Sequence, residues 1–117
     1  MRIRLTVNGQ VINATLAENA SARDFLALLP LSLTLEDYAS TEKISALPRK
    51  LTTQGSPAGI APDVGDITYY APWGNLAIFY RDFGYAAGLV KLGHLDAGVD
   101  ALHVGGSVQV TIEVESL

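Results

Sequence analysis

The stretch VGDITYYAPWGNLAIFYRD, residues 64–82, carries five of the nine aromatic residues and is the most informative segment for the fold. Apolar side chains alternate over 67–70 and 76–80, which is the period of β-strands. Between them Pro72 presets φ, and Gly74 and Asn75 tolerate a left-handed turn. The segment therefore predicts two strands joined by a turn. In the first, Ile67 and Tyr69 share one face and Thr68 and Tyr70 the other; in the second, Leu76, Ile78 and Tyr80 oppose Ala77 and Phe79.

Upstream, residues 2–7 alternate polar and apolar side chains and are followed by Asn8-Gly9. This pair favours the type I′ turn of a two-residue β-hairpin. A two-residue loop fixes the register of the hairpin. It pairs Val7 with Gln10, Leu5 with Ile12, and Ile3 with Ala14.

The remaining chain predicts one short helix and several more strands. Ser21 is the expected N-cap of the helix and Pro30 its end. Alternating polar and apolar residues predict further strands at 31–35, 89–95 and 108–114. Residues 37–61 are predicted to form a long loop that contains a helical turn near 42–47. Many strands without a βαβ rhythm favour a mainly β fold, either a barrel or a small β-rich α+β domain.

Composition limits the classes of function. With 117 residues, 49% hydrophobic and 17% charged, the chain is expected to form a single domain spanning residues 1–117. The lack of cysteine excludes disulfides and thiolate sites. A net charge of −4 with scattered basic residues argues against nucleic acid as a partner. No apolar run suits a membrane span or a signal peptide, so a cytoplasmic protein without membrane partners is expected.

Several of these segments together resemble the bacterial cyclophilin-like domain family. They are the Asn-Gly hairpin, the helix ending in Leu-Leu-Pro, DYASTEKI at 37–44, GDITYYAPWGNLAIFY at 65–80, and the strands at 89–95 and 108–114. The resemblance implies a closed barrel of about eight strands with one or two short helices, and no assigned activity. Relatives can accompany flavodoxin-like domains, which brings a redox partner into consideration, although no residue here supports one.

Cyclophilins themselves are peptidyl-prolyl isomerases, but their catalytic motifs are missing from this sequence. The Phe-His-Arg motif of cyclophilins has no counterpart here. Arg49 follows Leu47-Pro48, and Arg81 follows a predicted strand, so neither arginine is preceded by Phe-His. Residues 53–56 read Thr-Gln-Gly-Ser and not Gln-Gly-Gly-Asp. No residue is carried over as catalytic, because a shared fold does not imply a shared function.

A binding site is the first functional hypothesis. Trp73 lies in a Pro-Gly turn, where no periodicity buries it, and an exposed tryptophan often marks a contact surface. Tyr38 and Glu42 lie four residues apart, on one face if that stretch is helical. We expect an aromatic-lined pocket at one barrel mouth that accepts a small molecule or a short peptide. Its candidate residues are Tyr38, Glu42, Tyr70, Trp73, Phe79 and Asp82.

Two alternatives stay open. One is a diverged enzyme, either prolyl isomerase-like or an acid–base catalyst that combines a carboxylate with His94. The other is an interaction module, such as a homodimer built from edge strands. Only two histidines are present, without the spacing of metal ligands, so neither a metal nor a cofactor is expected.

Overall fold

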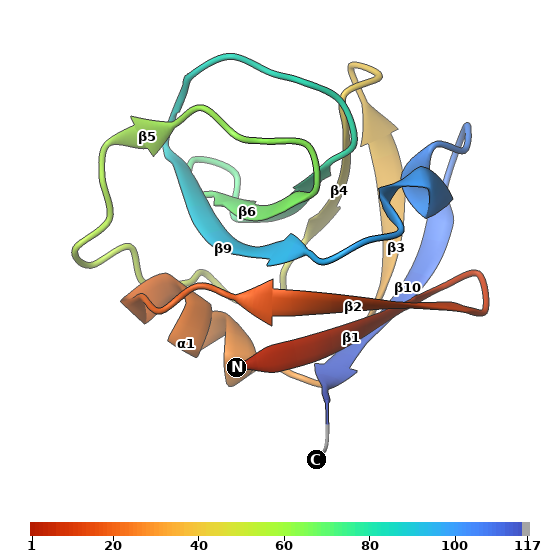
Figure 1. Cartoon of the computed structure of the whole chain (residues 1–117). Helices are drawn as coiled ribbons and strands as arrows, with labels where there is room; N and C mark the ends of the chain where they lie inside the picture. Colours follow the sequence, from red (N-terminus) through yellow and green to blue (C-terminus); the bar gives the residue numbers. More distant parts are fainter. Residues whose placement is uncertain (116–117) are drawn as a thin grey trace.

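Eight antiparallel strands form a sheet that closes on itself in the order β1-β10-β3-β4-β7-β6-β9-β2 (Figure 1). The computed structural model describes residues 1–115. The prediction of a mainly β, closed eight-stranded barrel is confirmed, and residues 1–115 also form one α-helix and one 3-10 turn. The elements are β1 (Arg2–Val7), β2 (Gln10–Leu16), α1 (Ala20–Leu26), β3 (Leu31–Tyr38), β4 (Glu42–Ala46), β5 (Gly59–Ile60), β6 (Asp66–Tyr70), β7 (Asn75–Phe79), β8 (Ala86–Ala87), β9 (Leu89–Leu95), the 3-10 turn (Val99–Leu102) and β10 (Val108–Val114). The short strands β5 and β8 pair with each other outside the barrel.

The N-terminal hairpin adopts the register that its sequence predicts. Val7 opposes Gln10, Leu5 opposes Ile12, and the turn residues Asn8 and Gly9 have φ angles of 49° and 84°. The other edge of β1 pairs with β10, so the first and last strands lie side by side (Figure 1). This pairing of the first and last strands closes the barrel.

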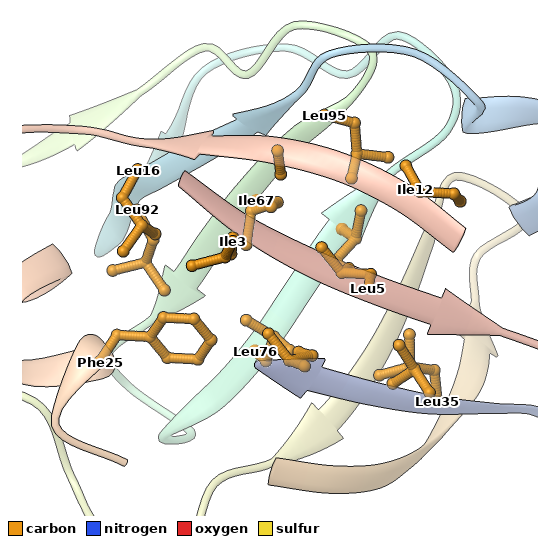
Figure 2. Close-up of a cluster of buried hydrophobic side chains, with 14 of the residues drawn as sticks. Ile3, Leu5, Ile12, Leu16, Phe25, Leu35, Ile67, Leu76, Leu92 and Leu95 are labelled. Carbon is orange, nitrogen blue, oxygen red and sulfur yellow. The ribbon is translucent and has the colours of Figure 1, made fainter. Parts of the chain in front are cut away.

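Apolar side chains from every wall of the barrel fill its interior. Ile3, Ile67 and Leu76 are fully buried there, although they come from strands far apart in the sequence (Figure 2). Phe25 of α1 is also fully buried and covers the end of the barrel where β1 begins. The interior is therefore a packed apolar core.

The predicted alternation of faces on β6 and β7 is confirmed. Ile67, Tyr69 and Ile78 belong to the interior core. Ala77 and Phe79 lie on the opposite, outer face and form a second apolar cluster with Leu89. The barrel wall thus buries apolar side chains on both faces in this region.

The ends of α1 differ from the prediction. Its N-cap is Asn19, whose side chain accepts a hydrogen bond from the Ala22 amide at 2.7 Å. Ser21 is instead inside the helix, and its hydroxyl donates to the Thr52 carbonyl at 2.6 Å. The helix ends at Leu26, before Pro30, because the intervening residues turn the chain into β3.

The helical turn predicted near 42–47 is wrong, because these residues form strand β4. β4 pairs with β3 on one side and β7 on the other, and two full ladders outweigh local propensity. The hairpin turn into β4 places Ala39 and Ser40 at φ angles of 55° and 56°. Glycine or asparagine normally takes such positions, so the sequence carries no ordinary signal for this turn.

The rest of the predicted long loop is anchored to the body of the protein. Asp24 of α1 accepts hydrogen bonds from the Thr52 amide and from Arg49, each at 2.7 Å. The Arg49 guanidinium holds the pKa of Asp24 below its usual value. The Leu51 amide donates to the buried Tyr69 hydroxyl at 3.1 Å. This loop therefore extends the core and is not a free lid.

Within residues 1–115, no helix is long and apolar enough to span a membrane.

Candidate functional site

An apolar pocket of about 170 Å³ lies on the outer wall of the barrel, beside the β6–β7 turn. It is open to solvent on one side, where Tyr38, Trp73 and Phe83 remain 44%, 56% and 42% exposed. Its floor is buried, because Phe79 and Leu89 are almost fully covered. The lining residues are Tyr38, Glu42, Ile44, Tyr70, Trp73, Phe79, Phe83, Ala86 and Leu89.

The register of the sheet gathers these residues. Tyr38 of β3 is directly opposite Glu42 of β4, and Glu42 is directly opposite Phe79 of β7. The three side chains form one row across neighbouring strands and project to the same face. Tyr70 of β6 is paired in the same way with Leu89 of β9. Five strands thus contribute to a single outer surface.

The structure therefore places five of the seven predicted residues around one pocket: Tyr38, Glu42, Tyr70, Trp73 and Phe79. The predicted location was wrong, however, since the pocket lies on the wall of the barrel and not at its mouth. The physical reason is the two-residue period of a strand, which turns these side chains away from the interior that their neighbours fill.

Trp73 is held by two tyrosine rings. Its ring centre lies 5.2 Å from that of Tyr70 and 5.5 Å from that of Tyr38, with interplanar angles of 88° and 80°. The turn that carries Trp73 packs against Gly88. A Cβ on Gly88 would lie 2.8 Å from the Pro72 ring, and its φ of 83° also favours glycine. The indole is thus exposed but fixed in position.

Glu42 is the charged side chain of the pocket. It is 8% exposed, and no donor among residues 1–115 hydrogen-bonds its carboxylate, whose oxygens are reached by water from the open side of the pocket. Burial among apolar neighbours raises the pKa of Glu42 to about 7. A carboxyl with such a pKa exchanges its proton near neutrality, and it can accept a hydrogen bond or pair with a cation.

Four lining residues escaped the sequence interpretation: Ile44, Phe83, Ala86 and Leu89. Ile44 was assigned to a helical turn, and its place in β4 turns it outward beside Glu42. Leu89 was correctly predicted to lie in a strand. The alternation of side chains along β9 could also have predicted that Leu89 points to the outer face. Phe83 lies in an irregular segment and packs on Phe79 with ring centres 5.7 Å apart. No sequence pattern predicts that contact.

Asp82 and His94 lie outside the pocket. Asp82 is exposed in the segment after β7, between Arg81 and Phe83. His94 belongs to β9, where its Nδ1 lies 2.7 Å from the Oδ1 of buried Asp66. The Lys91 ammonium is 3.3 Å from the same oxygen. His94 thus has a carboxylate partner, as the acid–base hypothesis requires, but neither residue lines the Trp73 pocket.

The end of the barrel opposite α1 holds a polar cluster. The fully buried Lys43 ammonium donates to the carbonyls of Val104 and Gly106 at 2.6 and 2.8 Å and lies 3.4 Å from Asp37. The Tyr80 hydroxyl donates a hydrogen bond to the Asp37 carboxylate. This hydrogen bond and the nearby Lys43 ammonium hold the pKa of Asp37 below its usual value. The cluster satisfies its own polar groups, which is typical of a structural role.

Metal-ligating side chains do not gather in threes anywhere in residues 1–115.

Comparisons with known proteins agree with this architecture. A solution structure of a hypothetical protein from Archaeoglobus fulgidus superimposes with a TM-score of 0.66 at 19% identity, covering 98% of this chain and 95% of that one. At such low identity the likeness shows the fold alone. No curated protein matches the chain significantly. The bacterial origin suggested by the sequence stays a prediction. The pattern of the Cyclophilin-like family matches residues 5–113, nearly the whole sequence, and the chain therefore belongs to that family.

Proposed function

We propose that this protein is a binding domain whose outer-wall pocket accepts a small molecule or one side chain of a short peptide. The observation that carries the proposal is the convergence of exposed aromatic rings on a preformed apolar hollow. Tyr38, Trp73 and Phe83 stay partly exposed around it, and clustered exposed aromatics are uncommon on a surface without a partner.

The size of the pocket limits what it binds. A cavity of 150 Å³ lined by apolar side chains accommodates benzene, and this pocket measures about 170 Å³. It therefore suits one compact group, with the rest of the ligand left outside the rim. Apolar burial supplies most of the affinity, and Glu42 supplies a polar contact that selects among ligands.

A panel of compact aromatic, aliphatic, cationic and anionic compounds, together with short peptides, tests the proposal. Binding is read from the emission of Trp73, the single tryptophan, and from the rise in melting temperature. The Trp73→Leu variant should lose the rise in melting temperature. The matched control Tyr85→Leu removes a 63% exposed aromatic residue outside the pocket and should keep it. The proposal fails if no compound acts, or if Trp73→Leu responds like the wild type.

A diverged enzyme is the second candidate, and the pKa of Glu42 favours it. A carboxyl that titrates near pH 7 in a pocket is suited to general acid–base work. For the prolyl isomerase version, the cis–trans exchange of an Ala-Pro peptide is followed with and without protein. An exchange rate equal to that in buffer would remove this version.

The homodimer also stays a proposal, but edge-strand pairing is poorly supported. Each of the eight barrel strands already has two neighbours, so the available edges in the described part of the chain are those of the two-residue strands β5 and β8. Sedimentation over a range of concentrations tests association directly.

A further inference from the structure

We propose that the group bound in this pocket is an alkylammonium, held against the rings of Trp73, Tyr38 and Tyr70 with Glu42 as its counter-charge. This inference rests on the proposed binding function and names the chemical class of the ligand. Two sources share that chemistry: a free quaternary amine such as choline, and a methylated lysine side chain on a peptide.

The arrangement of the rings is the first observation. Trp73 meets both tyrosines nearly at right angles, so the three rings form adjoining walls and not a stack. All three line the same pocket. A cation within about 6 Å of several ring centres is attracted by each ring quadrupole, and quaternary ammonium groups are recognised in aromatic cages of this kind.

The charge balance of the pocket is the second observation. Among residues 1–115, Glu42 is the single ionisable acid that lines it, and no lysine or arginine does so. Lys43, the next residue, faces the barrel interior. The other titratable groups in the lining are the phenols of Tyr38 and Tyr70. An anionic ligand would therefore meet only like charge, whereas a cation is complementary.

The missing partner of Glu42 is the third observation. Apolar neighbours cover most of the Glu42 side chain, and no donor among residues 1–115 reaches its carboxylate, whose oxygens contact water at the open side of the pocket. A cation in the pocket would supply the partner. Because burial holds the pKa of Glu42 near 7, ionisation is incomplete near neutrality in the empty pocket, and a bound cation favours the ionised form.

The volume and opening agree with this assignment. A trimethylammonium head has fewer heavy atoms than benzene and fits within about 170 Å³. The remainder of choline, or the chain of a methylated lysine, would leave through the open side between Tyr38, Trp73 and Phe83.

The test compares choline with its neutral carbon isostere, 3,3-dimethylbutan-1-ol, by titrating Trp73 emission at pH 8. We expect choline to bind with a Kd on the order of 1 mM and the isostere about tenfold more weakly. In Glu42→Gln the preference for choline should fall severalfold, and the part that remains is due to the aromatic rings. Glu18→Gln, which removes an exposed carboxylate outside the pocket, should behave like the wild type. A trimethyllysine peptide that binds at least tenfold tighter than choline would identify the side chain as the source, and the reverse order would identify the free amine.

Equal affinity for choline and its isostere would overturn the inference, and this comparison needs no variant to fold. An unchanged choline preference in Glu42→Gln would also overturn it, since the counter-charge would lie elsewhere. In both cases the pocket still binds and the proposed function survives. If neither choline nor its isostere binds but another compound of the panel does, only the assignment of a cationic ligand is disproved. If no compound binds, the proposed binding function is disproved as well.

Discussion

The indole of Trp73 lies edge-on to the phenol ring of Tyr70, with ring centres 5.2 Å apart and planes at 88°. The contact fixes an exposed side chain at the rim of a pocket without burying it in the core. Trp73 is 56% exposed, whereas Phe79 on the floor of the same pocket is 1% exposed. The two aromatics should therefore contribute very differently to stability and to binding.

Replacing Trp73 by alanine should lower the free energy of unfolding by about 1 kcal/mol, the value of its edge-on ring contacts. Replacing Phe79 by alanine should cost about 3 kcal/mol or more, because it opens a cavity beneath the outer cluster. Urea denaturation followed by circular dichroism measures both. Equal losses in the two variants would show that Trp73 is part of the core.

The buried carboxyl of Glu42 should make the wild type less stable as pH rises from about 4.5 to 7. Its pKa is raised from 4.5 to about 7 in the folded state, so the folded protein binds more protons than the unfolded chain over that window. The Glu42→Gln variant lacks this titration. Between pH 4 and pH 8, the free energy of unfolding of Glu42→Gln should therefore rise by about 2 kcal/mol relative to that of the wild type. This figure allows for the water that reaches the open side of the pocket.

Urea titrations of both proteins at pH 4, 6 and 8 give this difference, and comparing the two cancels the contribution of the other ionisable groups. A difference that stays constant with pH would mean that Glu42 has the same pKa folded and unfolded. A difference of the opposite sign would mean that Glu42 has a stabilising partner.

The ammonium of Lys43 should be essential to the polar end of the barrel. Lys43→Met removes the donor to the carbonyls of Val104 and Gly106 and leaves Asp37 without its cation, at a cost of about 3 kcal/mol. Lys50→Met removes an exposed lysine and should change stability by less than about 0.5 kcal/mol. Thermal unfolding of the two variants compares them, and similar melting temperatures would disprove the structural role.

The β3–β4 turn should tolerate glycine better than its native residue. Ala39 has a φ of 55°, which is unfavourable for a residue with a Cβ by roughly 1–2 kcal/mol. Ala39→Gly relieves that strain and should raise the free energy of unfolding by about 0.5 kcal/mol after the entropy cost of glycine. Denaturant unfolding tests this, and a loss of stability would show that the alanine methyl group makes a contact worth more than the strain.

Sequence patterns predicted the barrel wherever periodicity and turn chemistry agreed. Asn8-Gly9 fixed the register of the first hairpin, and alternation located β9 and β10. β4 was missed because its turn uses Ala39 and Ser40 in place of glycine or asparagine, and because a charged residue, Lys43, faces the core. Pairing with two neighbouring strands decides that segment, and such pairing is not visible locally.

The candidate site was partly predictable for the same reasons. Tyr38 and Glu42 were grouped by helical spacing, and the structure brings them together across a hairpin. Trp73 and Tyr70 were identified from their turn and strand. Phe83 was not, because its contact with Phe79 depends on the path of an irregular segment. The position on the wall depends on which face the core occupies, and this is fixed only when the barrel closes.

The indole N–H of Trp73 reports directly on whether the outer-wall pocket binds a ligand, because a single tryptophan gives a single cross-peak in the indole region of a ¹H–¹⁵N correlation spectrum. Titration with the compound panel should shift that cross-peak together with the amide signals of Tyr38, Glu42 and Phe79, in a saturable way. A bound compound that shifts signals elsewhere on the barrel while the indole cross-peak stays in place would contradict binding in the Trp73 pocket.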